Sequence, residues 1–113
     1  MEIIRQNEAT EIKVSESCST TEYLTHSPNI NIARIIISGR FPEKGVMWNT
    51  EVEEIIYVEK GSGHVCIEGA ESAVKQGDVV LYKKNEKVFW EGELILITTC
   101  TPPWTSKQHA IEE

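Results

Sequence analysis

The chain has 113 residues, a hydrophobic content of 40% and a formal net charge of −7 at pH 7. This length suits one domain with its own core, and the acidic balance argues against nucleic acid and anionic membrane surfaces as partners. No apolar stretch reaches the length of a membrane span, and the N-terminus lacks a secretory pattern, so we expect a cytoplasmic protein. Cys18, Cys66 and Cys100 have no metal-binding or redox spacing and are expected to be reduced, structural thiols.

Short segments of alternating or β-branched residues follow one another along the chain, separated by turns rich in Gly and Asn. Residues 1–16 alternate weakly and predict one or two short strands, at a sheet edge or exchanged with a partner. Further strands are predicted at 18–24, 30–37, 46–50, 53–58, 63–67, 72–75, 79–82, 88–90 and 94–99. One helical turn is expected near 107–109. Because no helical period is sustained, the sequence predicts an all-β sandwich or barrel.

The strongest local signal lies between Glu53 and Ile67. An acidic pair opens a β-branched and aromatic run, and Gly61-Ser62-Gly63 separates this run from a second alternating segment. A tight glycine turn between two such segments predicts a β-hairpin. Glu91-Gly92-Glu93 is predicted to be a turn as well.

Two motifs in this region resemble those of a small single-domain cupin of the RmlC-like kind. Glu54 is followed by Gly61, and Gly77-Asp78 opens the apolar run from Val79 to Leu81. The resemblance covers residues 20–104, which leaves 1–19 as an N-terminal strand or arm and 105–113 as a C-terminal tail. It implies a cupin-type jelly-roll β-barrel with an open mouth. It also implies a homodimer, in which a partner would cover the edge of the N-terminal strand.

The residues that hold a metal in similar cupins are mostly missing. The first motif usually carries His-x-His before its Glu, where this chain has Trp48 and Thr50, and the second usually carries a His where this chain has Val88. Only Glu54 of the four usual ligands remains, whereas a first-row metal in such a barrel normally needs several imidazoles. We therefore expect a barrel with no metal and no other cofactor.

Glu54 is the candidate catalytic residue. Alternation places Glu54 on one face with Ile56 and Val58, and the resemblance places that face inside the barrel. A carboxyl group buried without a cation has a raised pKa, which suits a general acid or base. The alternative is a residue that hydrogen-bonds Thr50 or water and has no further role.

The expected ligand-binding residues are aromatic side chains and positions where metal ligands are missing. They are Trp48, Thr50, Tyr82, Val88, Trp90 and Trp104. The histidines are weaker candidates and are expected at the surface or an interface, because His26 lies in a turn, His64 is offset from the inward positions and His109 lies in the tail.

Three functions remain open at this point. The first is a metal-independent cupin-domain protein that binds a small organic ligand inside the barrel. The second is a metal-free isomerase, cyclase or lyase that uses Glu54 for proton transfer. The third is a metal-dependent enzyme with a non-standard ligand set built on Glu54, Glu51 and His26. Fold alone does not choose among them.

Overall fold

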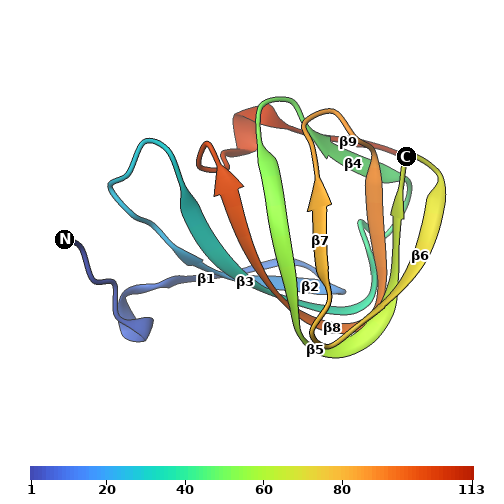
Figure 1. The fold of residues 1–113 in the computed structure, drawn as a ribbon, viewed down its shortest axis with the longest axis horizontal. Coiled ribbons are helices and arrows are strands. Elements are labelled where there is room, and N and C mark those ends of the chain that lie inside the picture. Colours follow the sequence, from blue (N-terminus) through green and yellow to red (C-terminus); the bar gives the residue numbers. More distant parts are fainter.

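A computed structural model describes residues 1–113, with side chains described for residues 1–107 and 109–113. Nine antiparallel strands form one strongly curled sheet, and the only helical segments in the described chain are two short 3₁₀ turns, Gln6–Glu8 and Ser106–Gln108 (Figure 1). The strands are β1 (Thr10–Ser15), β2 (Cys18–Tyr23), β3 (Asn31–Phe41), β4 (Val46–Asn49), β5 (Glu53–Ile67), β6 (Ala70–Lys75), β7 (Val79–Tyr82), β8 (Val88–Thr101) and β9 (His109–Glu112). The predicted all-β jelly-roll barrel is confirmed.

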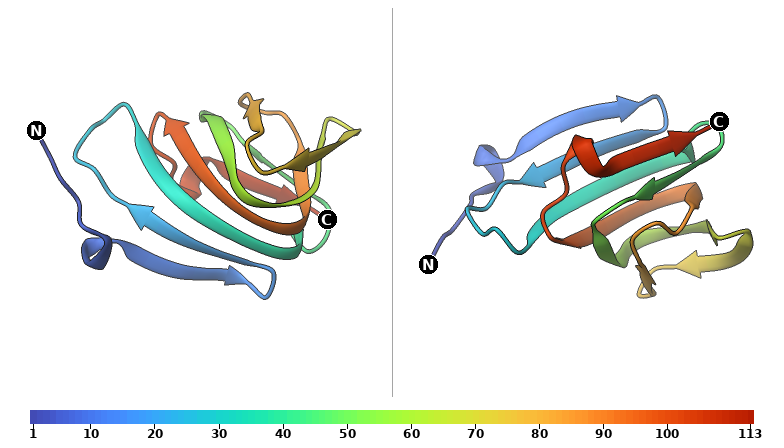
Figure 2. Two further views of the ribbon diagram at one scale, coloured as in Figure 1. Left: turned by 60° about the horizontal axis from the view of Figure 1, so that its bottom comes forward. Right: turned by 90° about the horizontal axis from the view of Figure 1, so that it is seen from above.

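The barrel wall follows the order β1-β2-β3-β8, and β8 also pairs with β5. β5 in turn pairs with β6 and β7. The two remaining strands, β4 and β9, pair with each other and lie across the opposite side of the barrel (Figure 2). No helix in the described part of the chain is long and apolar enough to cross a lipid bilayer.

The turns predicted at Gly61-Ser62-Gly63 and at Gly92 are wrong, because β5 and β8 each continue through these glycines without a turn. The two strands pair along their whole length, with one register shift between Val58 and Lys60. A Cβ atom on Gly61 would lie 1.9 Å from the backbone oxygen of Glu93. The glycines therefore serve a close approach of two bent strands rather than a hairpin turn.

Buried and exposed side chains alternate along the first half of β5, as the sequence predicts. Glu54, Ile56 and Val58 are buried, whereas Ile55 and Tyr57 are exposed on the outer face. The inward side chains of β3, β5 and β8 pack into an apolar core that includes Trp90, Leu94 and Leu96. This core fills part of the barrel interior and leaves the ends of β5 and β8 near Glu54 and Cys100 beside a cavity.

Both ends of the chain contribute strands to the sheet. Residues 1–19 contain β1, which pairs with β2 and forms one edge. Residues 105–113 contain the expected helical turn, as a 3₁₀ turn, and also β9, which pairs with β4 from Val46↔Glu112 to Asn49↔His109. The pairing satisfies backbone groups that β4 would otherwise expose, and it brings His109 beside the barrel interior.

Candidate ligand-binding cavity

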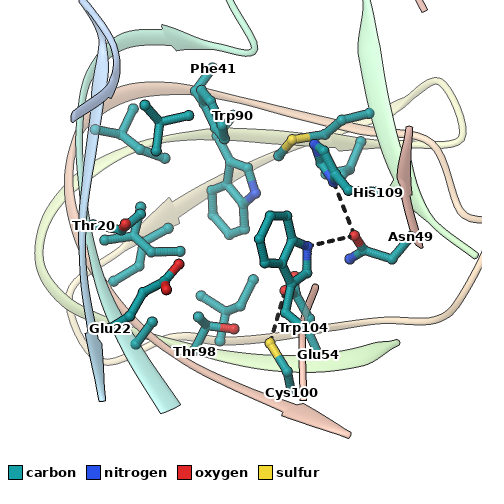
Figure 3. Close-up of a pocket in the computed structure, with 18 of the residues that line it drawn as sticks. Thr20, Glu22, Phe41, Asn49, Glu54, Trp90, Thr98, Cys100, Trp104 and His109 are labelled. Carbon is teal, nitrogen blue, oxygen red and sulfur yellow. Dashed lines mark hydrogen bonds between the residues drawn. The ribbon is translucent and has the colours of Figure 1, made fainter. Parts of the chain in front are cut away.

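A cavity of about 440 Å³ opens inside the barrel (Figure 3). Its walls are mostly apolar, and residues from β1, β2, β3, β4, β5, β7, β8 and β9 contribute to them. The size and the mixture of apolar walls with a few polar side chains are typical of sites for small organic ligands. The polar side chains come in three places, which are described in turn.

The Glu54 carboxyl group lies at the cavity wall and is only 7% exposed. Burial raises the pKa of this carboxyl above its ordinary value of 4.5, although the Tyr82 hydroxyl and the Cys100 thiol offset part of the rise. The Cys100 thiol donates a hydrogen bond to Glu54 Oε1 over 3.1 Å. Among the described residues no lysine or arginine pairs with Glu54, so no positive charge opposes the shift of this carboxyl towards its neutral form.

Tyr82 and Cys100 lie on the strands that flank Glu54. Tyr82 is opposite Glu54 on β7, and Cys100 is opposite Glu54 on β8. Burial, and then the neighbouring Glu54, raises the pKa of the Tyr82 hydroxyl and of the Cys100 thiol. Burial thus shifts all three groups towards their protonated, uncharged forms.

A second polar group is formed by Asn49, Trp104 and His109. The Asn49 side-chain oxygen accepts hydrogen bonds from Trp104 Nε1 and from His109 Nδ1, each over 3.1 Å (Figure 3). The Trp104 and His109 rings also contact each other, with centroids 5.4 Å apart. Because an amide oxygen only accepts, His109 Nδ1 carries the hydrogen, and in the neutral ring Nε2 keeps a free electron pair.

The expected surface position of His109 is wrong. The ring is half-buried and lines the cavity, and burial lowers its pKa below 6.5. No local sequence pattern indicates this position, because it follows from the pairing of β9 with β4. His26 and His64 are exposed, as expected, and His26 contacts Glu2.

A third polar group lies on the β2 side of the cavity and contains Thr20, Glu22 and Thr98. Thr98 is 2% exposed, and its hydroxyl, like that of Thr20, has no hydrogen-bond partner among the residues that the structure describes. Sequence reasoning missed this group. The signal that could have found it is the alternation of Cys18, Thr20 and Glu22 along β2, which places all three on the inward face.

Of the expected ligand-binding residues, Trp48, Tyr82, Val88, Trp90 and Trp104 line this cavity. Thr50 does not, because it is exposed in the bend after β4. Tyr82, Val88 and Trp90 are also buried in the core. Trp48 is half-buried, and the Lys87 ammonium lies 5.3 Å from the centre of its ring.

The donor atoms around Glu54 do not fit a metal centre of the kind that the resemblance implies. The usual imidazole positions hold Trp48, Thr50 and Val88, none of which supplies a nitrogen ligand. Among the residues that the structure describes, no group of three or more His, Cys, Asp or Glu side chains could hold a metal ion. The set of Glu54, Glu51 and His26 is not brought together.

Comparison with known proteins gives the fold independent support. No family model and no curated protein matches the sequence. The structure is similar to that of the nucleoside dehydratase Pac13 from Streptomyces, with a TM-score of 0.89 and 13% identity over 100% of this chain and 92% of that one. An RmlC-like cupin from Shewanella frigidimarina has a TM-score of 0.75 and 16% identity over 91% and 92% of the two chains. Ectoine synthase from P. lautus has a TM-score of 0.77 and 14% identity over 100% and 91%. The chain thus has the cupin fold without the usual metal-binding histidines.

Proposed function

We propose that this protein binds a small, ring-containing organic molecule inside its barrel without the help of a metal ion. The observation that carries the proposal is the cavity itself, in which aromatic and aliphatic walls surround a few inward polar groups. Apolar walls supply most of the affinity for such ligands, and a few fixed polar groups supply orientation.

The polar groups suit an organic ligand. Burial shifts Glu54 towards the neutral acid, and a neutral carboxyl group donates and accepts hydrogen bonds without a counter-ion. Asn49 holds Trp104 and His109 in fixed orientations, so the ligand does not have to order these rings on binding. Such preorganisation reduces the entropic cost of association.

The structural neighbours support a ring-containing ligand. Pac13 is a nucleoside dehydratase, and structures of its variants contain uridine. A nucleoside combines a flat ring with hydroxyl groups, which matches the mixture of indole surfaces and polar side chains lining this cavity.

The test is a thermal-shift and calorimetric screen of chelator-treated protein against nucleosides, with uridine first, and other small ring compounds. We expect at least one compound to bind with a stoichiometry of one per chain. Ala33→Phe is the blocking control, because Ala33 is a small residue in the cavity wall. It should abolish binding in a folded protein. Compounds that bind wild type and Ala33→Phe equally would contradict a site inside the barrel.

A second candidate function is proton-transfer catalysis, as in an isomerase, cyclase or lyase. It is favoured by a carboxyl group with a raised pKa, Glu54, and an imidazole with a free electron pair, His109, on the walls of one cavity. An acid and a base in this arrangement can act together on a bound molecule. A compound found in the screen would be incubated with the protein and followed by NMR. Glu54→Gln should stop its conversion and leave its binding nearly unchanged.

A further inference from the structure

The charges around the cavity are unevenly distributed. Two carboxyl side chains, Glu22 and Glu54, line the cavity, whereas no arginine does. The one lysine in the lining is Lys13, and its ammonium pairs with Glu16 over 3.3 Å on the exposed side of β1. Glu22, in contrast, has no ion-pair partner among the described side chains.

Strand register places Glu22 opposite an open part of the cavity. Glu22 pairs with Ala33 on β3, and Ala33 pairs with Thr98 on β8, so these three side chains form one inward row. The middle residue is small, which leaves space between the Glu22 carboxylate and Thr98 (Figure 3).

The hydroxyl of Thr98 gives an independent sign of a missing partner. Its interaction with the Cys100 thiol lowers the pKa of that thiol, but no atom of the described residues lies at hydrogen-bond distance and angle from the hydroxyl. Buried hydroxyls without a partner are uncommon, because losing the hydrogen bonds to water costs free energy. A ligand group held between Glu22 and Thr98 would satisfy the hydroxyl and the carboxylate together.

We propose that the ligand carries an amine, or another cationic group with N–H donors, and that Glu22 binds this group on the β2 side of the cavity, with Thr98 as the second contact. The inference rests on the proposed ligand binding. A carboxylate in a partly desolvated site attracts a cation and repels an anion more strongly than it would in water. Aromatic walls add to the preference, since cations are attracted to the faces of indole rings.

The test uses three probes of similar size that differ in charge: benzylamine, benzyl alcohol and benzoate. Binding to ¹⁵N-labelled protein is measured by NMR titration at pH 7 and low salt. We expect benzylamine to bind on the order of tenfold more tightly than benzyl alcohol, and benzoate to bind least well. In Glu22→Gln, benzylamine should lose this advantage while the affinity for benzyl alcohol stays the same.

Glu11→Gln is the matched control, because it removes the same charge from the β1–β2 hairpin at an exposed position outside the cavity. It should retain the preference for benzylamine. Equal binding of the three probes to wild type, or a preference that survives in Glu22→Gln, would overturn the inference and leave the proposed ligand binding intact. If none of the three probes shifts signals of cavity residues, the inference is overturned, and the proposed binding itself fails only if no compound of the screen binds either.

Discussion

The Cys100 thiol donates a hydrogen bond to the Glu54 carboxyl group, with 3.1 Å between Sγ and Oε1, from the directly opposite position on the neighbouring strand. Both side chains are buried, and neither has a charged partner. A weak neutral donor cannot compensate for the desolvation of a charged carboxylate. Burial therefore raises the pKa of Glu54, and this rise has consequences that can be measured.

Glu54 should make stability depend on pH. Because burial raises its pKa in the folded protein, the stabilising contribution of the protonated acid is complete below the ordinary value of 4.5 and is lost as pH rises through the folded-state pKa. Glu54→Gln removes the charge and should be more stable than wild type at pH 8 by about 1 to 3 kcal/mol. The difference should shrink towards pH 4.5, as measured by urea unfolding.

Glu53→Gln provides the control for this prediction. Glu53 precedes Glu54 on β5 but is exposed on the outer face of the sheet. In Glu53→Gln, the change in the free energy of unfolding between pH 5 and pH 8 should stay close to that of wild type. A Glu54→Gln protein that is less stable than wild type at pH 8 would contradict a neutral, desolvated Glu54.

The crossing of β5 and β8 should tolerate no side chain at Gly92. A Cβ atom there would lie 2.5 Å from the backbone oxygen of Ser62 and 2.6 Å from the Cα of Gly63. Gly92→Ala should lower the free energy of unfolding by about 2 to 4 kcal/mol.

Gly69→Ala separates this steric effect from the backbone effect. Gly69 also has a positive φ, of 81°, but nothing lies within 4 Å of its Cβ position. Gly69→Ala should lower the free energy of unfolding by only about 1 kcal/mol, because alanine is strained in a left-handed conformation. Equal losses in the two variants would show that contact between the strands is not what requires glycine.

These glycines also show where sequence reasoning succeeds and where it stops. Local patterns predicted nearly every strand, because alternation and β-branched residues are properties of short segments. They misplaced turns at Gly61-Ser62-Gly63 and Gly92, because the same residue serves a turn and a close crossing of strands. Only the partner strand distinguishes these two roles, and the partner lies far away in the sequence.

The same limit applies to the cavity. Alternation places Glu54 on one face with Ile56 and Val58, and the resemblance to small cupins places that face inside the barrel. The expectation of a raised pKa follows from burial without a cation. His109 and Thr98 were missed, because their positions depend on which strands pair, β9 with β4 in one case and β8 with β3 in the other. A short polar tail segment carries no local sign that it closes a barrel.

His109 should be neutral and carry its hydrogen on Nδ1 at pH 7.5, because Asn49 accepts from that atom and burial lowers the pKa of the ring. Multiple-bond ¹H–¹⁵N NMR distinguishes this tautomer from the Nε2–H form. Asn49→Asp places a carboxylate beside the ring and should raise the pKa of His109. Finding the Nε2–H form in wild type would contradict the hydrogen bond.

The protein should form a homodimer. The outer face of β5 and β7 exposes two cross-strand apolar pairs, Ile55 with Leu81 and Tyr57 with Val79. Contiguous exposed apolar side chains favour association. Light scattering should therefore give twice the chain mass, and Tyr57→Lys should reduce it towards the monomer. Ile30→Lys, at an exposed position in the loop before β3, should have no effect. A concentration-independent monomer in wild type would refute the prediction.

The central claim is that this barrel binds a small organic ligand by means of its own side chains. The most direct measurement is an NMR titration of chelator-treated, ¹⁵N-labelled protein with a compound from the screen, observed at the indole N–H signals of Trp48, Trp90 and Trp104, which all line the cavity. We predict saturable shifts of these signals that are the same with and without the chelator. Shifts that appear only after one equivalent of a divalent metal is restored, or that leave the indole signals unchanged, would contradict the account.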